Sequence, residues 1–222
     1  MLPYQPEELY MEPSPDPKKR AQPGWDKLFK PPRPFVPKTL DELVTWSEQT
    51  ADGLMRQTGS VPPLLIILGD DGVQVMSIGC LETVADKNRF ATMAKLFCTA
   101  HAASACVMVL ESWMSFAKPG DSLEKHDPPS EAFDRKEVLV LMGEERGRTV
   151  AKALPILRTD AGGFFGFGEN GLSPDTLVEG RFAGLLPPKV PTQEQRQLAA
   201  TLLMSLDGMP SSKWRSRSLA IS

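Results

Sequence analysis

Three carboxylates and one histidine, close together in the middle of the chain, are the residues that could carry out chemistry. Glu111, Asp134 and Glu137 supply the acids, and His126 lies between them in the sequence. Two carboxylates held near each other raise the pKa of one, because two negative charges resist sharing a site, and that carboxyl can then act as a general acid. These four residues are the catalytic candidates of a hydrolase-like enzyme.

The same stretch also has a purely structural interpretation. Arg135 follows Asp134, and a guanidinium forms charge-assisted pairs with carboxylates such as Glu111. An ion pair of this kind would close the end of a sheet without any reaction, and structural ion pairs outnumber active sites. Ser130 follows two prolines, where a turn or cap role is typical. Together with Trp113, Ser130 and Arg135 are candidates for binding a partner.

Other catalytic and ligand-binding patterns are incomplete. His126 lies near Ser130, but neighbours in sequence do not supply the geometry of a catalytic triad, and the sequence has no G-x-S-x-G elbow. His101 follows Cys98 by three positions without any C-x-x-C pair, so a buried helical histidine is favoured over a metal ligand. "GGFFGFGE" departs from the G-x-G-x-x-G spacing of dinucleotide sites. We predict no metal and no cofactor.

The charged residues need strands to bring them together. Residues 105–116 and 136–142 both have strand character, and an antiparallel pairing between them would bring Glu111 towards residues 135–137. A hairpin continues from 136–142 through "GEERG" into 148–158, and the Phe-rich segment 162–169 favours one more strand. An earlier hairpin, "PLLIILGDDGVQVMSIG", has a two-residue turn predicted at Asp71–Gly72.

Three helices are expected around these strands. Thr39 and Glu42 have the spacing of a capping box at the start of the first, and the second is expected over residues 86–103. The last begins at Thr192, which again has capping-box spacing with Gln195, and Gly208 ends it. Its predicted apolar stripe consists of Leu198, Leu202 and Leu206.

Strands that come in runs, rather than alternating with helices, favour an antiparallel sheet. We therefore predict an α+β fold: a single antiparallel-rich sheet of about five to six strands, packed by two to three helices. The predicted domain spans residues 39–207, with a loop at 170–191 and a final helix at 192–207. A Pro-rich, extended arm at 1–38, which we expect to be disordered, precedes it, because ten of the 21 prolines lie in residues 1–37, and a short basic tail at 208–222 follows.

Composition narrows the functional classes. The net charge is only −3, which makes nucleic acid an unlikely partner, although "KWRSRS" in the tail leaves weak association with nucleic acid open.

No apolar run approaches the ~20 residues of a membrane helix, and the acidic, Pro-broken start is no signal peptide. Three cysteines suit reduced thiols, so we expect a cytoplasmic protein. The arm segment "KPPRPFVP" could bind a protein partner; the sequence leaves the oligomeric state open.

Residues 111–140 contain the pattern Glu111-x-Trp113, then Pro129-Ser130, then D-R-x-E-V-L from residue 134 to residue 139. This pattern resembles an E-x-W … P-S-x-x-x-D-R-x-E-V-L signature of small bacterial and phage-borne proteins. The resemblance covers about thirty residues and brings no activity with it. It implies a bacterial or prophage origin, and it singles out Glu111, Trp113, Asp134, Arg135 and Glu137.

The first hypothesis is a non-enzymatic binding or accessory protein, because no catalytic set in the sequence is complete. The second is the hydrolase-like enzyme that would use Glu111, Asp134, Glu137 and His126. The third is weak nucleic-acid association through the basic tail.

Overall fold

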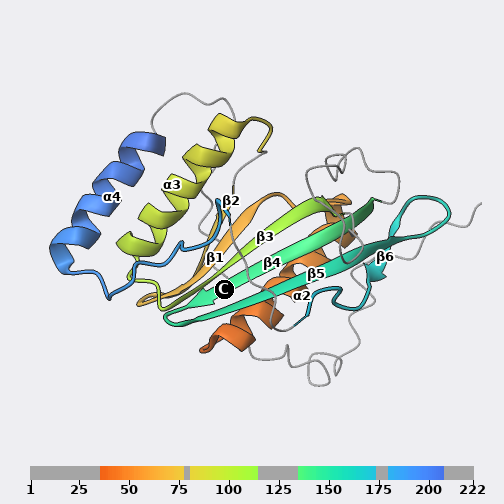
Figure 1. Ribbon diagram of the computed structural model, residues 1–222, viewed down its shortest axis with the longest axis horizontal. Coiled ribbons are helices and arrows are strands. Elements are labelled where there is room, and N and C mark those ends of the chain that lie inside the picture. Colours follow the sequence, from red (N-terminus) through yellow and green to blue (C-terminus); the bar gives the residue numbers. More distant parts are fainter. Residues whose placement is uncertain (1–35, 78–80, 115–134, 174–179, 208–222) are drawn as a thin grey trace, which may run out of the picture. The chain divides into compact units, whose positions relative to one another are not determined.

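The computed structural model of the protein describes residues 36–77, 81–114, 135–173 and 180–207. Its elements, in chain order, are α2 (Leu40–Thr58), β1 (Leu64–Gly69), β2 (Gly72–Ser77), α3 (Val84–Ala100), β3 (Ala105–Met114), β4 (Lys136–Glu145), β5 (Arg148–Arg158), β6 (Phe164–Phe167) and α4 (Gln193–Asp207) (Figure 1). The predicted order of helices and strands is confirmed.

The described strands form one six-stranded sheet in the order β2-β1-β3-β4-β5-β6, and every neighbouring pair is antiparallel. The chain leaves the edge strand β2, passes through α3, and returns as β3 on the free side of β1. The predicted α+β class, with one antiparallel sheet and three helices in the described part, is confirmed.

Side chains alternate along each central strand and build a core on each face of the sheet. Leu64 and Ile66 of β1 face α2, whereas Leu65 and Ile67 face the opposite side. Helix α2 covers the first face through its fully buried stripe, which consists of Leu40, Leu43, Val44, Ala51 and Met55.

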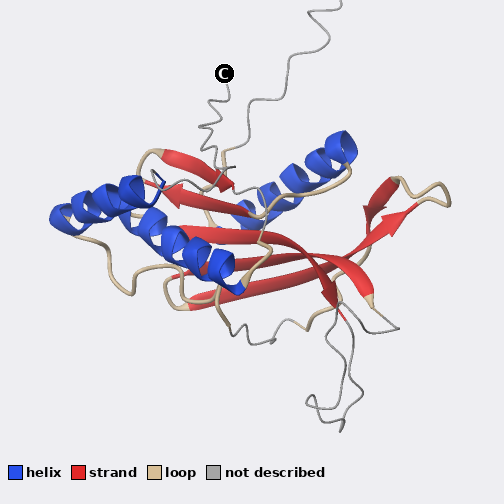
Figure 2. Ribbon diagram, turned by 90° about the horizontal axis from the view of Figure 1, so that it is seen from above, coloured by secondary structure: helices blue, strands red, loops and turns tan. Residues whose placement is uncertain are grey.

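Helices α3 and α4 lie side by side and belong to the second core (Figures 1 and 2). Phe90, Met93 and Cys98 of α3 are buried there against Leu65 and Met108 of the sheet. Because both faces of β1 and β3 are covered, these two strands are apolar in almost every position over their paired length.

The local signals of the helices are mostly as predicted. The Thr39 hydroxyl accepts from the N–H of Glu42, but the Glu42 carboxylate accepts from the N–H of Lys38, one residue before the expected partner. In α4, Thr192 and Gln195 make both bonds of the box. Helix α3 begins at Val84, two residues earlier than predicted, because Thr83 and Asp86 form a complete capping box there.

The turns differ from the prediction by one or more residues. In the first hairpin Gly69 faces Gly72, so the loop consists of Asp70 and Asp71, and Gly72, with φ of 92°, already belongs to β2. In the second hairpin only two residues, Arg146 and Gly147, form the turn. Strand β4 therefore extends to Glu145, three residues beyond the predicted end.

The apolar stripe predicted for the last helix is only partly the packed one. Ala199 is buried, and Leu203 and Leu206 pack on the second core. Leu198 and Leu202 are instead exposed, at 61% and 44%. Helix α4 carries two adjacent apolar stripes, and its contacts with α3 determine which one is covered.

Several predicted features lie outside the described residues: the arm up to residue 35, the tail from 208 onward, and the candidates His126, Ser130 and Asp134. Within the described part, no helix is both long and apolar enough to cross a membrane.

Candidate functional site at the ends of β3 and β4

Pairing of β3 with β4 brings the candidate residues of both strands together. Trp113 faces Glu137 directly, and Glu111 faces Leu139. Since Leu139 belongs to the core under α2, Glu111, Trp113 and Glu137 all lie on the α2 face of the sheet. The expectation that Glu111 approaches residues 135–137 through antiparallel strands is thus met in the geometry.

Glu137 is held by an arginine of the next strand. Both of its carboxylate oxygens accept from Arg158, at 2.6 Å from Nη2 and 2.8 Å from Nε. About two-thirds or more of each of these two side chains is shielded from solvent. The hydrogen bonds to Glu137 raise the pKa of Arg158. The carboxylate of Glu137 is therefore committed to joining β4 and β5, which is the structural role of an ion pair.

Glu111 has a different environment. Its Oε1 accepts a short hydrogen bond from the backbone N–H of Val61. Burial raises the pKa of Glu111, and the charge of Glu137 adds to this rise, whereas the Val61 N–H and the Arg158 guanidinium act in the opposite direction. The half-buried site thus increases the proton affinity of Glu111.

Trp113 and Arg135 form a pair at the surface. The indole is 44% exposed, and the Arg135 guanidinium lies over its ring, 4.8 Å from the centroid. A cation held over an aromatic face gains from the ring quadrupole, so the two side chains orient each other. Two of the three predicted binding residues are thus in contact; the third, Ser130, lies outside the described residues.

A pocket of about 640 Å³ opens beside Glu111, at the edge of β3. Its lining comes from four parts of the chain. The apolar lining residues are Val61, Pro62, Pro63, Leu81, Leu110 and Phe182; Lys87 and Arg181 are the cations, and Ser60 and Ser112 are the uncharged polar residues. No local sequence pattern predicts Lys87 and Arg181 at this pocket, because α3 and the segment after residue 180 meet only in the fold.

A buried acid of β4 anchors that segment. The Glu144 carboxylate is 8% exposed and accepts three backbone N–H bonds, from Gly184 at 2.6 Å, Leu185 at 2.9 Å and Leu186 at 3.3 Å. Glu144 is not among the predicted site residues, because the prediction places all of "GEERG" in the turn. A two-residue turn would have left Glu144 inside the strand, which is the signal that could have found it.

The remaining chemical candidates have structural surroundings. His101 packs its ring against Phe97, with 4.6 Å between the centroids. Cys98 and Cys106 are buried, and their mutual hydrogen bond together with burial raises the pKa of Cys106. Among the described residues, no group of three or more His, Cys, Asp and Glu side chains could hold a metal ion.

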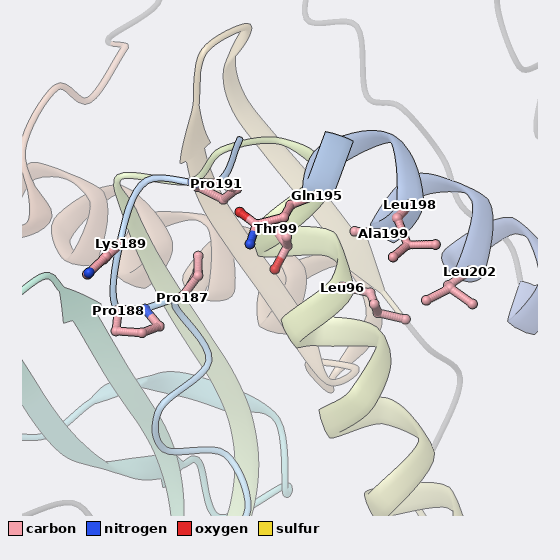
Figure 3. A pocket seen from close by; sticks show the side chains of 10 residues that line it. All are labelled: Leu96, Thr99, Pro187, Pro188, Lys189, Pro191, Gln195, Leu198, Ala199 and Leu202. Atoms are coloured by element: carbon pink, nitrogen blue, oxygen red, sulfur yellow. The ribbon is translucent and has the colours of Figure 1, made fainter. Parts of the chain in front are cut away.

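A second hollow, of about 460 Å³, lies between α3, α4 and the Pro-rich segment before α4 (Figure 3). Leu96 and Thr99 of α3 face Leu198 and Leu202 of α4 across it, and Lys189 lies at its proline side. We call it the α3–α4 groove. Its lining is mostly apolar and includes none of the candidates from residues 111–137.

No protein-family model, no curated protein and no solved structure matches this chain. Inferences about its function therefore start from the geometry at the ends of β3 and β4.

Proposed function

We propose that the chain is a non-enzymatic binding or accessory protein, of the bacterial or prophage cytoplasm, that contacts a protein partner through the Trp113–Arg135 pair. The observation that carries this proposal is the exposed indole with a guanidinium stacked on it. Tryptophan and arginine are the residue types most enriched among those that dominate protein–protein binding energies.

The position of the pair favours binding as well. Trp113 is paired with Glu137 in the β3–β4 ladder, and Arg135 directly precedes the first paired residue of β4, Lys136, so the ladder positions the backbone at Trp113 and next to Arg135 before a partner arrives. The ion pair between Glu137 and Arg158 ties the same end of β4 to β5. A side chain that is already oriented loses less conformational entropy on binding, which leaves more of the contact energy for affinity.

The hydrolase-like alternative rests on Glu111, because a carboxyl with a raised pKa that lines a pocket is a functional candidate. Asp134 lies outside the described residues, so the second carboxylate that the structure can place beside Glu111 is Glu137. Both oxygens of Glu137 are bonded to Arg158, and Glu137 is not among the residues that line the pocket. This arrangement supports the binding proposal over the enzyme.

Partner capture with matched variants tests the proposal. Purified wild type, Trp113→Ala, Arg135→Ala and Phe165→Ala are immobilised and incubated with bacterial lysate, and retained proteins are quantified by mass spectrometry. Phe165 is the control because it is an exposed aromatic residue, at 68%, on β6. We expect a retained protein that falls roughly tenfold or more with either substitution in the pair and stays constant with Phe165→Ala. Equal retention by all four proteins would refute the role of the pair.

The enzyme alternative has a separate test. Wild type, Glu111→Gln and Glu137→Gln are assayed with a panel of ester, phosphoester and glycoside substrates. Turnover by wild type that is lost in Glu111→Gln, with the melting temperature unchanged, would favour catalysis. Under the binding proposal, wild type and both variants give the same background rate.

A further inference from the structure

We propose that the pocket beside Glu111 binds a small amphipathic anion: an apolar body that carries one carboxylate, sulfonate or phosphate group. This inference goes beyond the proposed function, because it uses Lys87, Arg181 and the apolar wall of the pocket, not the exposed Trp113–Arg135 pair. The pocket volume of about 640 Å³ lies within the range of roughly 300–1,000 Å³ typical of small-molecule sites.

Two cations of the pocket carry the argument. Lys87 is half-buried and Arg181 is exposed, and the charged group of neither side chain has a hydrogen bond or ion pair to another described residue. Taking an ammonium group partly out of water is unfavourable unless an opposite charge or an acceptor compensates. An anionic group in the pocket would supply that compensation for Lys87, and Arg181 at the same pocket would add a second positive charge.

The fold brings the two cations to the same wall. Lys87 and Phe90 are three residues apart on α3 and therefore share a face of the helix. The Phe182 ring packs edge-on against Phe90, with 5.9 Å between the centroids. This contact places Arg181, the neighbour of Phe182, close to the Lys87 end of α3. The Glu144 carboxylate, bonded to the backbone from Gly184 onward, holds the same segment.

The other residues of the lining determine how an anion would lie. Glu111 on β3 faces the pocket with its carboxylate already bonded to Val61, so an anion would avoid this side. The lining also includes the apolar side chains of Leu81, Leu110 and Phe182. A ligand with its charge at Lys87 and Arg181 and its apolar body against these apolar side chains matches this lining.

Fluorescence titration with 8-anilinonaphthalene-1-sulfonate tests the inference, since this probe has an apolar ring system and one sulfonate. N-phenyl-1-naphthylamine, with the same rings and no charge, is the comparison probe. We expect saturable binding of the sulfonate, weakened roughly tenfold in Kd by Lys87→Gln and again by Arg181→Gln, because a charge-assisted hydrogen bond is worth that much. The uncharged probe should bind both variants within about twofold of wild type. Octanoate should displace the sulfonate, and 1-octanol at the same concentration should not.

The α3–α4 groove supplies the matched controls. Lys189→Gln removes a cation from that groove, and Leu202→Glu adds an acid to its apolar wall. Neither change should alter the affinity for the sulfonate, and all four variants should keep the wild-type melting temperature because the substituted side chains are at least partly exposed.

Three results would overturn the inference. The first is an affinity that Lys87→Gln and Arg181→Gln leave unchanged. The second is an affinity lost in Leu202→Glu instead, which would place the probe in the α3–α4 groove. The third is equal binding of the charged and uncharged probes with no displacement by octanoate. None of these outcomes bears on the Trp113 variants, so failure here is distinguishable from failure of the proposed function.

Discussion

Removal of the Glu144 carboxylate should destabilise the protein far more than removal of its neighbour, Glu145. Glu144 is buried and is the acceptor for Gly184, Leu185 and Leu186, all in one segment 40 residues further along the chain. Glu145 lies on the following position of β4, is partly exposed, and forms an ion pair with Arg148 at 3.2 Å. The two acids are adjacent in sequence and opposite in environment.

The magnitude follows from the three donors. The N–H of Leu185 is in a fully buried residue, and an unsatisfied buried donor costs about 1–3 kcal/mol. Gly184 is exposed and Leu186 is half-buried, so water replaces part of their bonds and each contributes about 0.5–1 kcal/mol. Glu144→Ala should therefore cost about 2–5 kcal/mol, a large share of the ~5–15 kcal/mol typical of a domain. Glu144→Gln keeps one acceptor oxygen and should cost roughly half as much.

Urea denaturation followed by circular dichroism gives the free energy of unfolding of wild type, Glu144→Ala, Glu144→Gln and Glu145→Gln. The control should lose about 0–1 kcal/mol, as surface ion pairs do. Limited digestion with trypsin adds a local measurement, because Arg181 lies just before the anchored segment. Cleavage after Arg181 should accelerate in both Glu144 variants and stay at the wild-type rate in Glu145→Gln.

Glu144→Ala and Glu145→Gln with equal free energies of unfolding would refute this reasoning. So would a loss of stability in Glu144→Ala without faster cleavage after Arg181, because the carboxylate would then stabilise something other than the segment from Gly184 to Leu186.

Three further predictions concern the sheet. Gly69→Ala would place a methyl group 2.7 Å from the backbone oxygen of His101. We therefore expect the free energy of unfolding, measured by urea titration, to fall by about 1–3 kcal/mol. A decrease smaller than the error of the titration would contradict the close approach. Glu137→Gln breaks the bidentate pair with Arg158. It should lower the free energy of unfolding by about 1 kcal/mol in low salt and by less in high salt. A decrease that does not depend on salt would argue against an electrostatic origin. Burial raises the pKa of Glu111 above 4.5. The free energy of unfolding of the wild type, relative to that of Glu111→Gln, should therefore be highest below pH 4.5 and should decline as the pH rises through the raised pKa. Parallel curves of unfolding free energy against pH for the two proteins would exclude the shift.

The sheet could be predicted from the sequence because its signals are local. Apolar, β-branched runs of strand length, separated by Gly- and Asp-containing turns, indicate hairpins, and hairpins in succession form an antiparallel sheet. Such signals do not specify which stripe of a helix is covered. In α4 the stripe through Leu198 and Leu202 is as apolar as the one through Ala199 and Leu203, and the packing of α4 against α3 determines which of the two is covered.

The candidate site could be predicted in part. The antiparallel register brought Glu111, Trp113 and Glu137 together as expected. The arginine that binds Glu137 was not identified, although the hairpin contained the signal: Val138 faces Pro155, which leaves Glu137 and Arg158 a diagonal step apart on neighbouring strands. The pocket could not be predicted at all, since its cations come from α3 and from the segment after residue 180, which no local pattern places next to β3.

The two prolines before β1 explain why a site forms at this end of the sheet. Strand β3 pairs with β4 along its entire length, but within the described residues it pairs with β1 only up to Val109, which faces Leu64. The next residues of the chain towards the N-terminus, Pro63 and Pro62, have no N–H to donate and so cannot extend the β1 ladder. The second half of β3 therefore lacks its β1 neighbour. Glu111 takes up the free N–H of Val61 there, and the pocket occupies the space along the same edge.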